Sequence, residues 1–180
     1  ELPEVDYIEA NLRGEFYQTT VQVGPTWGLD RVDQRLLPLD NQYAYDGDAA
    51  FVHAYIIDSG MRVSHNEFGA RATQDFTVHT GGDMSDCANH GTHVGGTVGG
   101  TMFGIAKDVT LHSVRVGNNA CVPDTISVIA GVQWVTANRM VPAVANMSLG
   151  VGPSPALDTA VNASIAAGVT YVVAAGNSNN

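Results

Sequence analysis

Apolar, β-rich runs alternate along this chain with segments of helical pattern, and this alternation limits the possible fold more than any other feature. Four runs have the composition of strands, and each ends in a short stretch that contains Gly: 49–57, 109–116, 143–149 and 169–176. Runs that are apolar throughout predict strands buried on both faces, which is typical of a parallel sheet covered by helices.

Two segments between these runs have apolar residues at helical spacing. Segment 125–138 follows Asp124, which can serve as its N-cap. Segment 155–167 follows Ser154, starts with a proline and ends at a glycine. In this second helix we expect four residues to face inward: Leu157, Ala160, Val161 and Ile165.

The order of strand, helix, strand, helix and strand predicts right-handed crossovers. We therefore expect an α/β fold, a three-layer sandwich with a mostly parallel central sheet and with ligands bound where the strands' carboxyl ends emerge.

Composition and charge exclude several classes of protein. Hydrophobic residues make up 44% of the 180 residues and charged residues 14%, which argues against disorder and against a charge-rich coiled coil. The 18 acidic residues against 8 basic ones give no basic face for nucleic acid. The longest apolar stretches are far short of the roughly 20 residues that span a bilayer, so we expect no membrane partner.

The first residues lack the pattern of a secretory signal and the chain has no initiating Met, so we expect the numbering to begin inside a longer precursor. Cys87 and Cys121 are compatible with one disulfide outside the cytosol, or with two buried free thiols. A Gly-Pro stretch at 18–26 is the one plausible domain boundary.

The stretch DCANHGTHV (86–94) holds two histidines three residues apart. His90 and His93 would share a helix face, and with Asp86 they would form an open zinc set. The glycines that follow instead suit a helix pressed against a neighbour, because each interior Gly costs up to about 1 kcal/mol against Ala. Two other interpretations of His90 remain. It could be a general base presented at the start of a helix, or a packed structural histidine.

Two further residues end predicted strands and complement such a base. Asp58 closes the first run, where its partly desolvated carboxylate needs a partner such as an imidazole N–H. Asn177 closes the last run and offers an amide donor. Together with His90 they would supply the orienter, the base and the oxyanion donor of an acyl-transfer site.

Four motifs in this order, IIDSG, HGTHVGGT, ANMSLG and VVAAGNSN, resemble those of the subtilases, the subtilisin-like serine proteases. The stretch WGLDRVDQRLLPLD is similar to the secreted branch that contains proteinase K and aqualysin. The Asp, His, Ser chain order and the oxyanion Asn of subtilisin are standard examples in enzymology, so these roles are inherited from the resemblance.

The resemblance implies that Asp58 orients His90, that His90 is the general base and that Asn177 stabilises the oxyanion. Ser148, Leu149 and Gly150 would offer a backbone edge to an extended polypeptide substrate. The pocket for the residue before the scissile bond would be lined by Ala174, Ala175 and Gly176. His93 becomes a packed structural histidine.

The family's serine lies in a Gly-Thr-Ser-Met-Ala motif, and no Gly-Thr-Ser occurs in these 180 residues. We therefore expect an incomplete chain that does not cleave peptides by itself. Residues 1–20 resemble the end of the family's inhibitory propeptide, which makes 21–180 the amino-terminal portion of the peptidase domain. Cleavage is expected between Gln18 and Pro25, although an N-terminal extension of the domain is the alternative.

Calcium is the cofactor that the resemblance implies. Oxygen-bearing side chains that suit a hard cation cluster near residues 30–42: Asp30, Asp33, Gln34, Asp40 and Gln42. Asp83 and Asp86, which precede the predicted His90 helix, form either a second calcium site or a solvated acidic loop, and we expect the solvated loop. Asn89 stands where the family has Gly, which predicts a left-handed backbone. The resemblance also implies the Cys87–Cys121 bond.

The sequence thus predicts part of a secreted serine endopeptidase, monomeric when complete, whose partners are polypeptide substrates and its own propeptide. The alternative from another class is a non-catalytic subtilase-like binding or inhibitory module. A metal hydrolase built on His90 and His93 is the third hypothesis.

Overall fold

A computed structural model describes residues 19–177 of the chain. Its elements in chain order are β1 (Thr19–Val23), α1 (Trp27–Val32), β2 (Gln42–Asp46), β3 (His53–Asp58), β4 (Ala72–Thr77), α2 (His90–Gly99), β5 (Thr110–Arg115), α3 (Thr125–Asn138), β6 (Ala143–Met147), α4 (Pro155–Ala166) and β7 (Val169–Val173).

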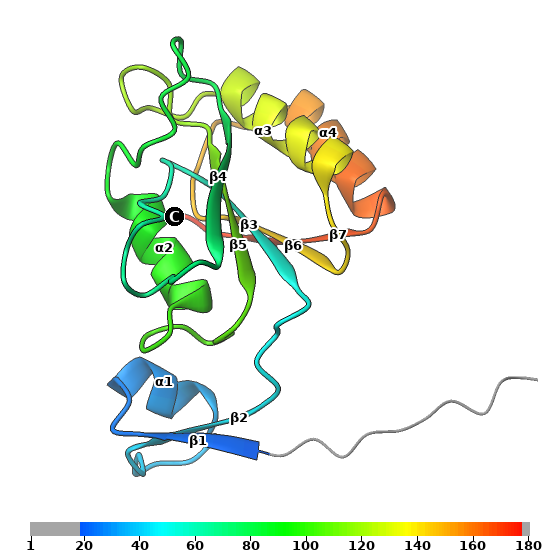
Figure 1. Ribbon diagram of the computed structural model, residues 1–180. Coiled ribbons are helices and arrows are strands. Elements are labelled where there is room, and N and C mark those ends of the chain that lie inside the picture. The colour runs from blue at the N-terminus through cyan, green and yellow to red at the C-terminus, as the bar shows by residue number, and fades with distance from the viewer. Residues whose placement is uncertain (1–18, 178–180) are drawn as a thin grey trace, which may run out of the picture.

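The main sheet has five strands in the order β4-β5-β3-β6-β7, and every neighbouring pair runs parallel. Helix α2 packs against β3 and β5, whereas α3 and α4 lie together on the opposite face (Figure 1). The predicted α/β sandwich with a mostly parallel sheet is confirmed.

Alternation along β3 divides the core between the two faces of the sheet. Ile56 packs into the α2 side with Leu111, while the next residue, Ile57, packs into the α3 side with Val114. All four side chains are fully buried. Burial of each such residue contributes about 1.5–3 kcal/mol to folding, which fixes the position of the Asp58 that follows.

The first predicted strand is shorter at its start than the expected 49–57. Ala49 takes a left-handed conformation (φ 64°), and the Val52 N–H donates back to its carbonyl at 2.9 Å. Residues 49–52 therefore form a turn, and Phe51 is 86% exposed. The runs 143–149 and 169–176 also end early as strands, at Met147 and Val173.

Both predicted helices form with the expected caps. The Ser127 N–H donates to Asp124 at 2.9 Å, and the Leu157 N–H donates to Ser154 at 3.3 Å. The prediction that Ile165 faces inward was wrong, because this residue is 49% exposed. Ser164 continues the buried stripe instead, with its hydroxyl accepting from Tyr171 at 2.9 Å.

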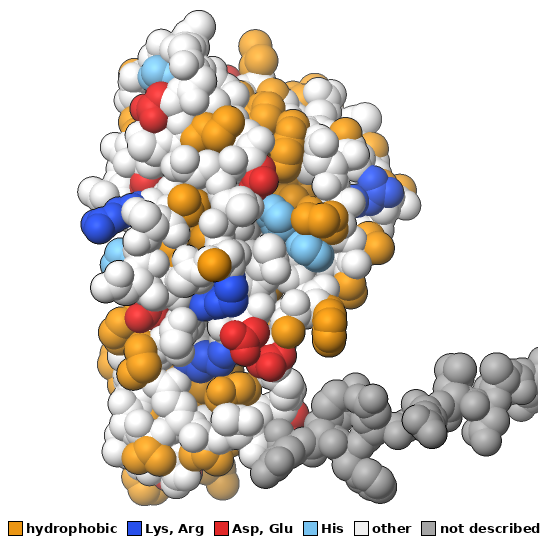
Figure 2. All heavy atoms as spheres, viewed as in Figure 1, with side chains coloured by type: hydrophobic (Ala, Val, Ile, Leu, Met, Phe, Trp, Pro, Cys, Tyr) orange, Lys and Arg blue, Asp and Glu red, His pale blue; other side chains and the backbone are white. Residues whose placement is uncertain are grey.

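Four elements did not follow from sequence patterns. Strands β1 and β2 form a separate antiparallel pair with α1 between them in the chain. Strand β4 is an edge strand whose sequence, ATQDFT, is too polar to read as a buried run. Figure 2 shows hydrophobic side chains at the surface of the lower part of the molecule, where α1, β1 and β2 lie.

None of the helices within residues 19–177 has the length and apolar character that a membrane span needs. The predicted boundary between residues 20 and 21 falls inside β1, and residues 1–18 lie outside the described part of the chain.

Candidate active site

The carboxylate of Asp58 and the imidazole of His90 meet at the carboxyl edge of the sheet. His90 Nδ1 lies 2.8 Å from Asp58 Oδ1 and 3.0 Å from Oδ2. The Asp58 side chain is 3% exposed and that of His90 is 54% exposed. A buried carboxylate therefore holds a ring that remains open to solvent.

This contact settles the tautomer of the neutral ring. A carboxylate only accepts hydrogen bonds, so the proton of neutral His90 lies on Nδ1 and the lone pair on Nε2. The Ser59 N–H also donates to Asp58 Oδ1, at 2.7 Å. With its acceptor nitrogen free, His90 can take a proton from a nucleophile.

Helix α2 begins at His90 and approaches the end of β3 very closely. A Cβ on Gly91 would lie 2.1 Å from the Gly60 carbonyl oxygen, and one on Gly95 would lie 2.5 Å from the Met61 methyl carbon. The close approach predicted from these glycines is confirmed. Asn89 takes the predicted left-handed conformation, with φ 60°.

A cavity of about 230 Å³ opens beside this pair. Its lining comes from the ends of β3 and β6, from the start of α2 and from the loop after β5: Asp58, Ser59, Ala88, His90, Gly117, Cys121, Pro123, Ser148, Leu149 and Gly150. The structure thus brings three of the predicted substrate-binding residues, 148–150, next to Asp58 and His90.

The loop after β5 forms one wall of this cavity and folds back on itself. Gly117 and Pro123 form an isolated antiparallel bridge, and the Asn118 N–H donates to the Val122 carbonyl at 3.1 Å. Cys121 takes φ 59° and forms a disulfide with Cys87, with a Cα–Cα distance of 5.7 Å. The disulfide joins this wall to the loop that precedes His90.

The remaining predicted residues of the site lie after β7. Ala174, Ala175, Gly176 and Asn177 are exposed and are not among the residues that line the 230 Å³ cavity. The Ala174 N–H donates to the Met147 carbonyl at 3.1 Å, which keeps the start of this segment beside β6. Their predicted roles stay predictions.

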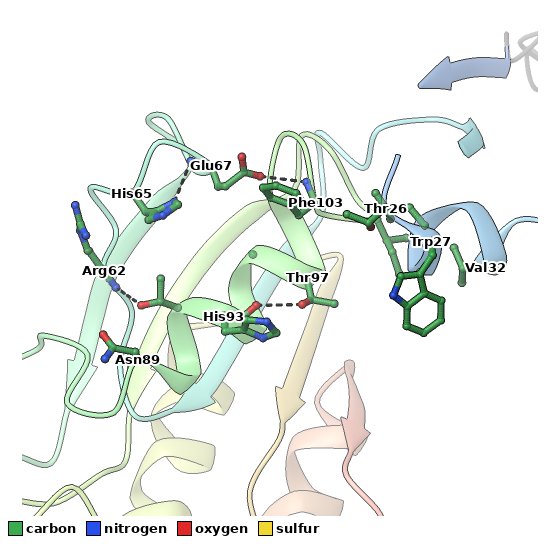
Figure 3. A pocket seen from close by; sticks show the side chains of 15 residues that line it. Thr26, Trp27, Val32, Arg62, His65, Glu67, Asn89, His93, Thr97 and Phe103 are labelled. Carbon is green, nitrogen blue, oxygen red and sulfur yellow. Dashed lines mark hydrogen bonds between the residues drawn. The ribbon is translucent and has the colours of Figure 1, made fainter. Parts of the chain in front are cut away.

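His93 is not the packed structural histidine that was expected. Its side chain is exposed and lines a larger cavity of about 840 Å³. Figure 3 shows His93 and Thr97 of α2 facing this space, with Trp27 and Val32 of α1 beside it. His93 lies on the exposed face of α2 together with Thr97, whereas Gly91, Gly95 and Gly99 form the buried face toward the sheet.

No group of three or more His, Cys, Asp or Glu side chains in residues 19–177 is arranged to hold a metal ion. The zinc hypothesis on Asp86, His90 and His93 therefore has no support from this geometry. Asp86 instead binds the amino end of α2, where its Oδ2 accepts from the Thr92 N–H at 2.8 Å.

Asp83 is exposed, as expected for a solvated acidic loop, whereas Asp86 is half-buried, and both carboxylates accept hydrogen bonds. Asp83 pairs with the buried guanidinium of Arg115 at 3.0 Å. Hydrogen bonds from Ser85 and then from Arg115 lower the pKa of Asp83 to about 2. Burial would raise the pKa of Asp86, but hydrogen bonds from Thr92 and Ser59 outweigh it and the pKa lies below its usual value.

The five predicted calcium ligands lie in and around the loop between α1 and β2: Asp30 is in α1, Asp33, Gln34 and Asp40 are in the loop, and Gln42 begins β2. Asp30 is 4% exposed, and its two oxygens accept from the N–H groups of Asp40 and Asn41 at 3.3 and 2.8 Å. Asp33 accepts from the Ala44 N–H, and Asp40 accepts from the Gln42 N–H at 3.1 Å. Gln34 donates to the carbonyls of Leu36 and Pro38.

Sequence reasoning missed Ser59, Asp86 and Arg115 as parts of this site. Ser59 is a small polar residue directly after a predicted strand, and Arg115 lies in an apolar strand pattern. Asp86 lies three positions before the N-cap residue Asn89, too far along the chain for the N-cap spacing to reveal it. The roles of these three residues depend on tertiary contacts, which local sequence patterns do not show.

An exposed imidazole oriented by a buried carboxylate at the carboxyl edge of a parallel sheet has the geometry that the base and orienter of an acyl-transfer site require. Comparison with known proteins agrees with this class. The sequence pattern of the subtilase family matches residues 49–180. The chain belongs to the subtilase family.

Individual relatives are similar over nearly the whole chain. An extracellular serine proteinase of Thermus sp. (strain Rt41A) is 55% identical over 178 residues, which are 98% of this chain and 43% of that protein. An alkaline serine exoprotease A of Vibrio alginolyticus is 49% identical over 182 residues, covering 98% of this chain and 34% of its own length. This chain thus spans less than half the length of both relatives.

A solved structure shows the same fold. The crystal structure of a cold adapted subtilisin-like serine proteinase superposes with a TM-score of 0.82 and 47% sequence identity, over 87% of this chain and 57% of that one.

Proposed function

We propose that this chain is part of a longer secreted serine endopeptidase, with Asp58 and His90 as two members of its catalytic triad. The observation that carries the proposal is the 2.8 Å contact between the buried Asp58 carboxylate and the exposed His90 ring. The names of the relatives, an extracellular serine proteinase and an alkaline serine exoprotease A, support the reaction class and the secreted location.

In the proposed reaction, a serine hydroxyl attacks the carbonyl carbon of a peptide bond and transfers its proton to His90 Nε2. Asp58 accepts the Nδ1–H and stabilises the imidazolium that forms. His90 then gives the proton to the leaving amine, and the acyl-enzyme remains. Water repeats the attack with His90 as base and releases the acid.

The oxyanion and the substrate require further groups. We assign the Asn177 side-chain amide to the oxyanion, because it is exposed at the end of β7 and can donate to developing charge. Residues 148–150 would pair with an extended substrate, which fits their position in the wall of the 230 Å³ cavity. Residues 174–176 would line the pocket for the residue before the scissile bond.

The nucleophile is proposed to lie beyond Asn180, since no Gly-Thr-Ser occurs within the 180 residues. The chain spans 43% of its Thermus relative, which leaves room for such a segment. Without the serine, the 180-residue chain is expected to be inactive. Residues 1–20 are proposed to be the end of a propeptide that is removed near β1, and the complete enzyme is proposed to be a monomer.

The test begins with the coding sequence past Asn180, where a Gly-Thr-Ser-Met-Ala motif is expected. The full protein should then hydrolyse a chromogenic peptide and be inactivated by a serine-directed fluorophosphonate. His90→Ala should lower kcat by about 10⁴-fold or more. Ser154→Ala, which removes the N-cap of α4, is the matched control and should leave kcat unchanged. A stop codon after Asn180 would support a non-catalytic binding module instead.

We also propose a structural calcium ion at the loop between α1 and β2, held by oxygens of Asp30, Asp33, Gln34, Asp40 and Gln42. The support is Asp30, a buried carboxylate whose hydrogen bonds come from neutral backbone amides. Each carboxylate keeps free lone pairs for a cation. Because the acidic side chains alone form no cluster within residues 19–177, Gln34, Gln42 and backbone carbonyls would complete the ligand set.

A further inference from the structure

The amino end of α2 lacks a cap from its own sequence. Asn89 holds the N-cap position in a left-handed conformation, and its side chain makes no capping hydrogen bond. The N–H groups in the first turn of a helix need acceptors from elsewhere. Those of Gly91 and Thr92 find them in two side chains outside the helix.

The two acceptors are Ser59 and Asp86. The Gly91 N–H donates to Ser59 Oγ at 3.0 Å, and the Thr92 N–H donates to Asp86 Oδ2 at 2.8 Å. Ser59 Oγ in turn donates to Asp86 Oδ1 at 2.7 Å. The two side chains therefore act as one cap, joined by a hydrogen bond and supplied from two different segments of the chain.

This cap connects the two proposed catalytic residues through the backbone. Ser59 directly follows Asp58, and the two capped N–H groups directly follow His90 in the first turn of α2. The end of β3 thus holds the His90 ring with one residue and the His90 helix with the next. His90 is the first residue of the helix, where fraying starts, so its position depends on this first turn.

The loop that carries Asp86 is itself held in place by Arg115 and by a disulfide. The guanidinium of Arg115, which is fully buried, donates to the carbonyls of Asp83 and Ser85 at 3.1 and 3.0 Å. The disulfide from Cys87 holds the other side of Asp86. Asp86 also keeps its negative charge at a helix amino end, where the helix dipole favours it.

We propose that Ser59 and Asp86 are positioning residues that hold His90 against Asp58 by capping α2 from outside. The proposal rests on the proposed protease function. Both side chains would act through His90: they raise kcat by keeping the imidazole aligned. Substrate affinity should change little, because the substrate is proposed to pair with residues 148–150, whereas the Ser59 hydroxyl is engaged with Gly91 and Asp86.

The test uses the full-length protease and four variants: Ser59→Ala, Ser59→Thr, Asp86→Ala and Asp86→Asn. Both alanine variants should lower kcat by about 10- to 100-fold, as expected for a misplaced catalytic group, with KM within about twofold. Thr at position 59 keeps the hydroxyl and should restore kcat. Asn at 86 keeps one acceptor oxygen and should give an intermediate kcat.

Ser154→Ala is the matched control, because it removes an N-cap hydroxyl from α4. It should lower the melting temperature by about 2–4 °C, as Ser59→Ala should also do, but it should leave kcat unchanged. If the Ser59→Ala variant loses thermal stability but keeps the kcat of the wild type, the cap is merely structural and the proposal fails.

The experiment distinguishes failure of the proposed protease function from failure of the proposed positioning role. An inactive wild-type protein overturns the protease function itself, whereas an active wild type with fully active Ser59 and Asp86 variants overturns only the positioning role. Should Asp86→Ala give no soluble protein, Asp86→Asn decides: a kcat equal to that of the wild type contradicts the proposal.

Discussion

Gly91 lies so close to Gly60 that a Cβ on Gly91 would sit 2.1 Å from the Gly60 carbonyl oxygen. The next nearest atoms to that Cβ are Cβ and Oδ1 of Asp58, at 3.1 and 3.2 Å. The absence of a side chain at position 91 is therefore what allows helix α2 to bring His90 up to Asp58.

We predict that Gly91→Ala destabilises the protein, because the clash is with backbone and cannot be relieved by a side-chain rotation. The cost should reach about 1–3 kcal/mol or more, as for other overpacked sites. Gly96→Ala is the matched control: a Cβ there meets nothing within 4 Å, so the helix should gain up to about 1 kcal/mol. Chemical denaturation of both variants measures the difference, and equal stabilities would refute the prediction.

The contrast between these glycines also shows what sequence reasoning can reach. The run of small residues after His90 predicted a closely packed helix, because interior glycines are costly unless something needs the space. It did not reveal that Gly91, Gly95 and Gly99 are needed and Gly96 is not, since this depends on the helix rotation that only tertiary contacts fix.

The same division holds for the site. Asp58 and His90 were predictable because each sits at the boundary of a strongly patterned element. Ser59, Asp86 and Arg115 were not, because their roles arise from contacts across about 27 to 32 residues of sequence. The edge strand β4 was missed for a related reason, since an edge strand does not need an apolar sequence.

Loss of the Cys87–Cys121 disulfide should destabilise the fold by about 3–4 kcal/mol, because the bond closes a loop with a sequence separation of 34 residues. The double variant Cys87→Ser/Cys121→Ser should unfold at a lower guanidinium concentration than the wild type. Reducing agent should move the wild type to the same midpoint and leave the double variant where it is. A wild-type midpoint that does not respond to complete reduction would rule out this contribution.

The Asp83–Arg115 ion pair should make stability depend on pH in the acid range. The pKa of Asp83 falls from 3.8 to about 2 in the folded state, chiefly through hydrogen bonds from Ser85 and then Arg115. The unfolded chain therefore binds the proton first, and the contribution of Asp83, complete above pH 3.8, is lost as the pH falls toward about 2. Asp83→Asn should flatten this part of the curve of melting temperature against pH. A slope identical to that of the wild type would contradict the assignment.

A second pH dependence is expected nearer neutrality, from a chain of three side chains across β4, β5 and β3. His112 Nδ1 lies 3.1 Å from the Asp75 carboxylate, and His112 Nε2 lies 2.9 Å from His53 Nδ1. Because the carboxylate accepts from Nδ1 of neutral His112, its Nε2 accepts from His53. Burial, and then repulsion from the His112 ring when that ring is protonated, lower the pKa of His53 below 6.5.

A lowered histidine pKa means that the unfolded chain takes up the proton more readily than the folded one. The contribution of His53 is then complete above pH 6.5 and declines as the pH falls below that value. We expect His53→Gln to lose stability at pH 8 and to show a smaller further loss between pH 7 and 5 than the wild type. Thermal melts over this range provide the measurement, and parallel curves for the two proteins would disprove the effect.

Calcium should raise the melting temperature if the loop between α1 and β2 binds it. Asp30 is buried with only neutral donors on its oxygens, so a cation would relieve an uncompensated charge. A ligand that binds only the folded state at 100 times its Kd adds about 2.7 kcal/mol. The melting temperature of the protein freed of metal by chelation should therefore rise as calcium is added back.

Asp30→Asn should abolish this rise in melting temperature. Asp48→Asn should retain it, because Asp48 is an exposed acid whose side chain caps the turn at Ala50. A calcium response that survives Asp30→Asn would place the ion elsewhere in the protein, and no response in the wild type would remove calcium from this loop. Magnesium is the control for general screening of the acidic chain: because it demands near-octahedral geometry at shorter distances, it should raise the melting temperature less than calcium does, and an equal rise would indicate screening.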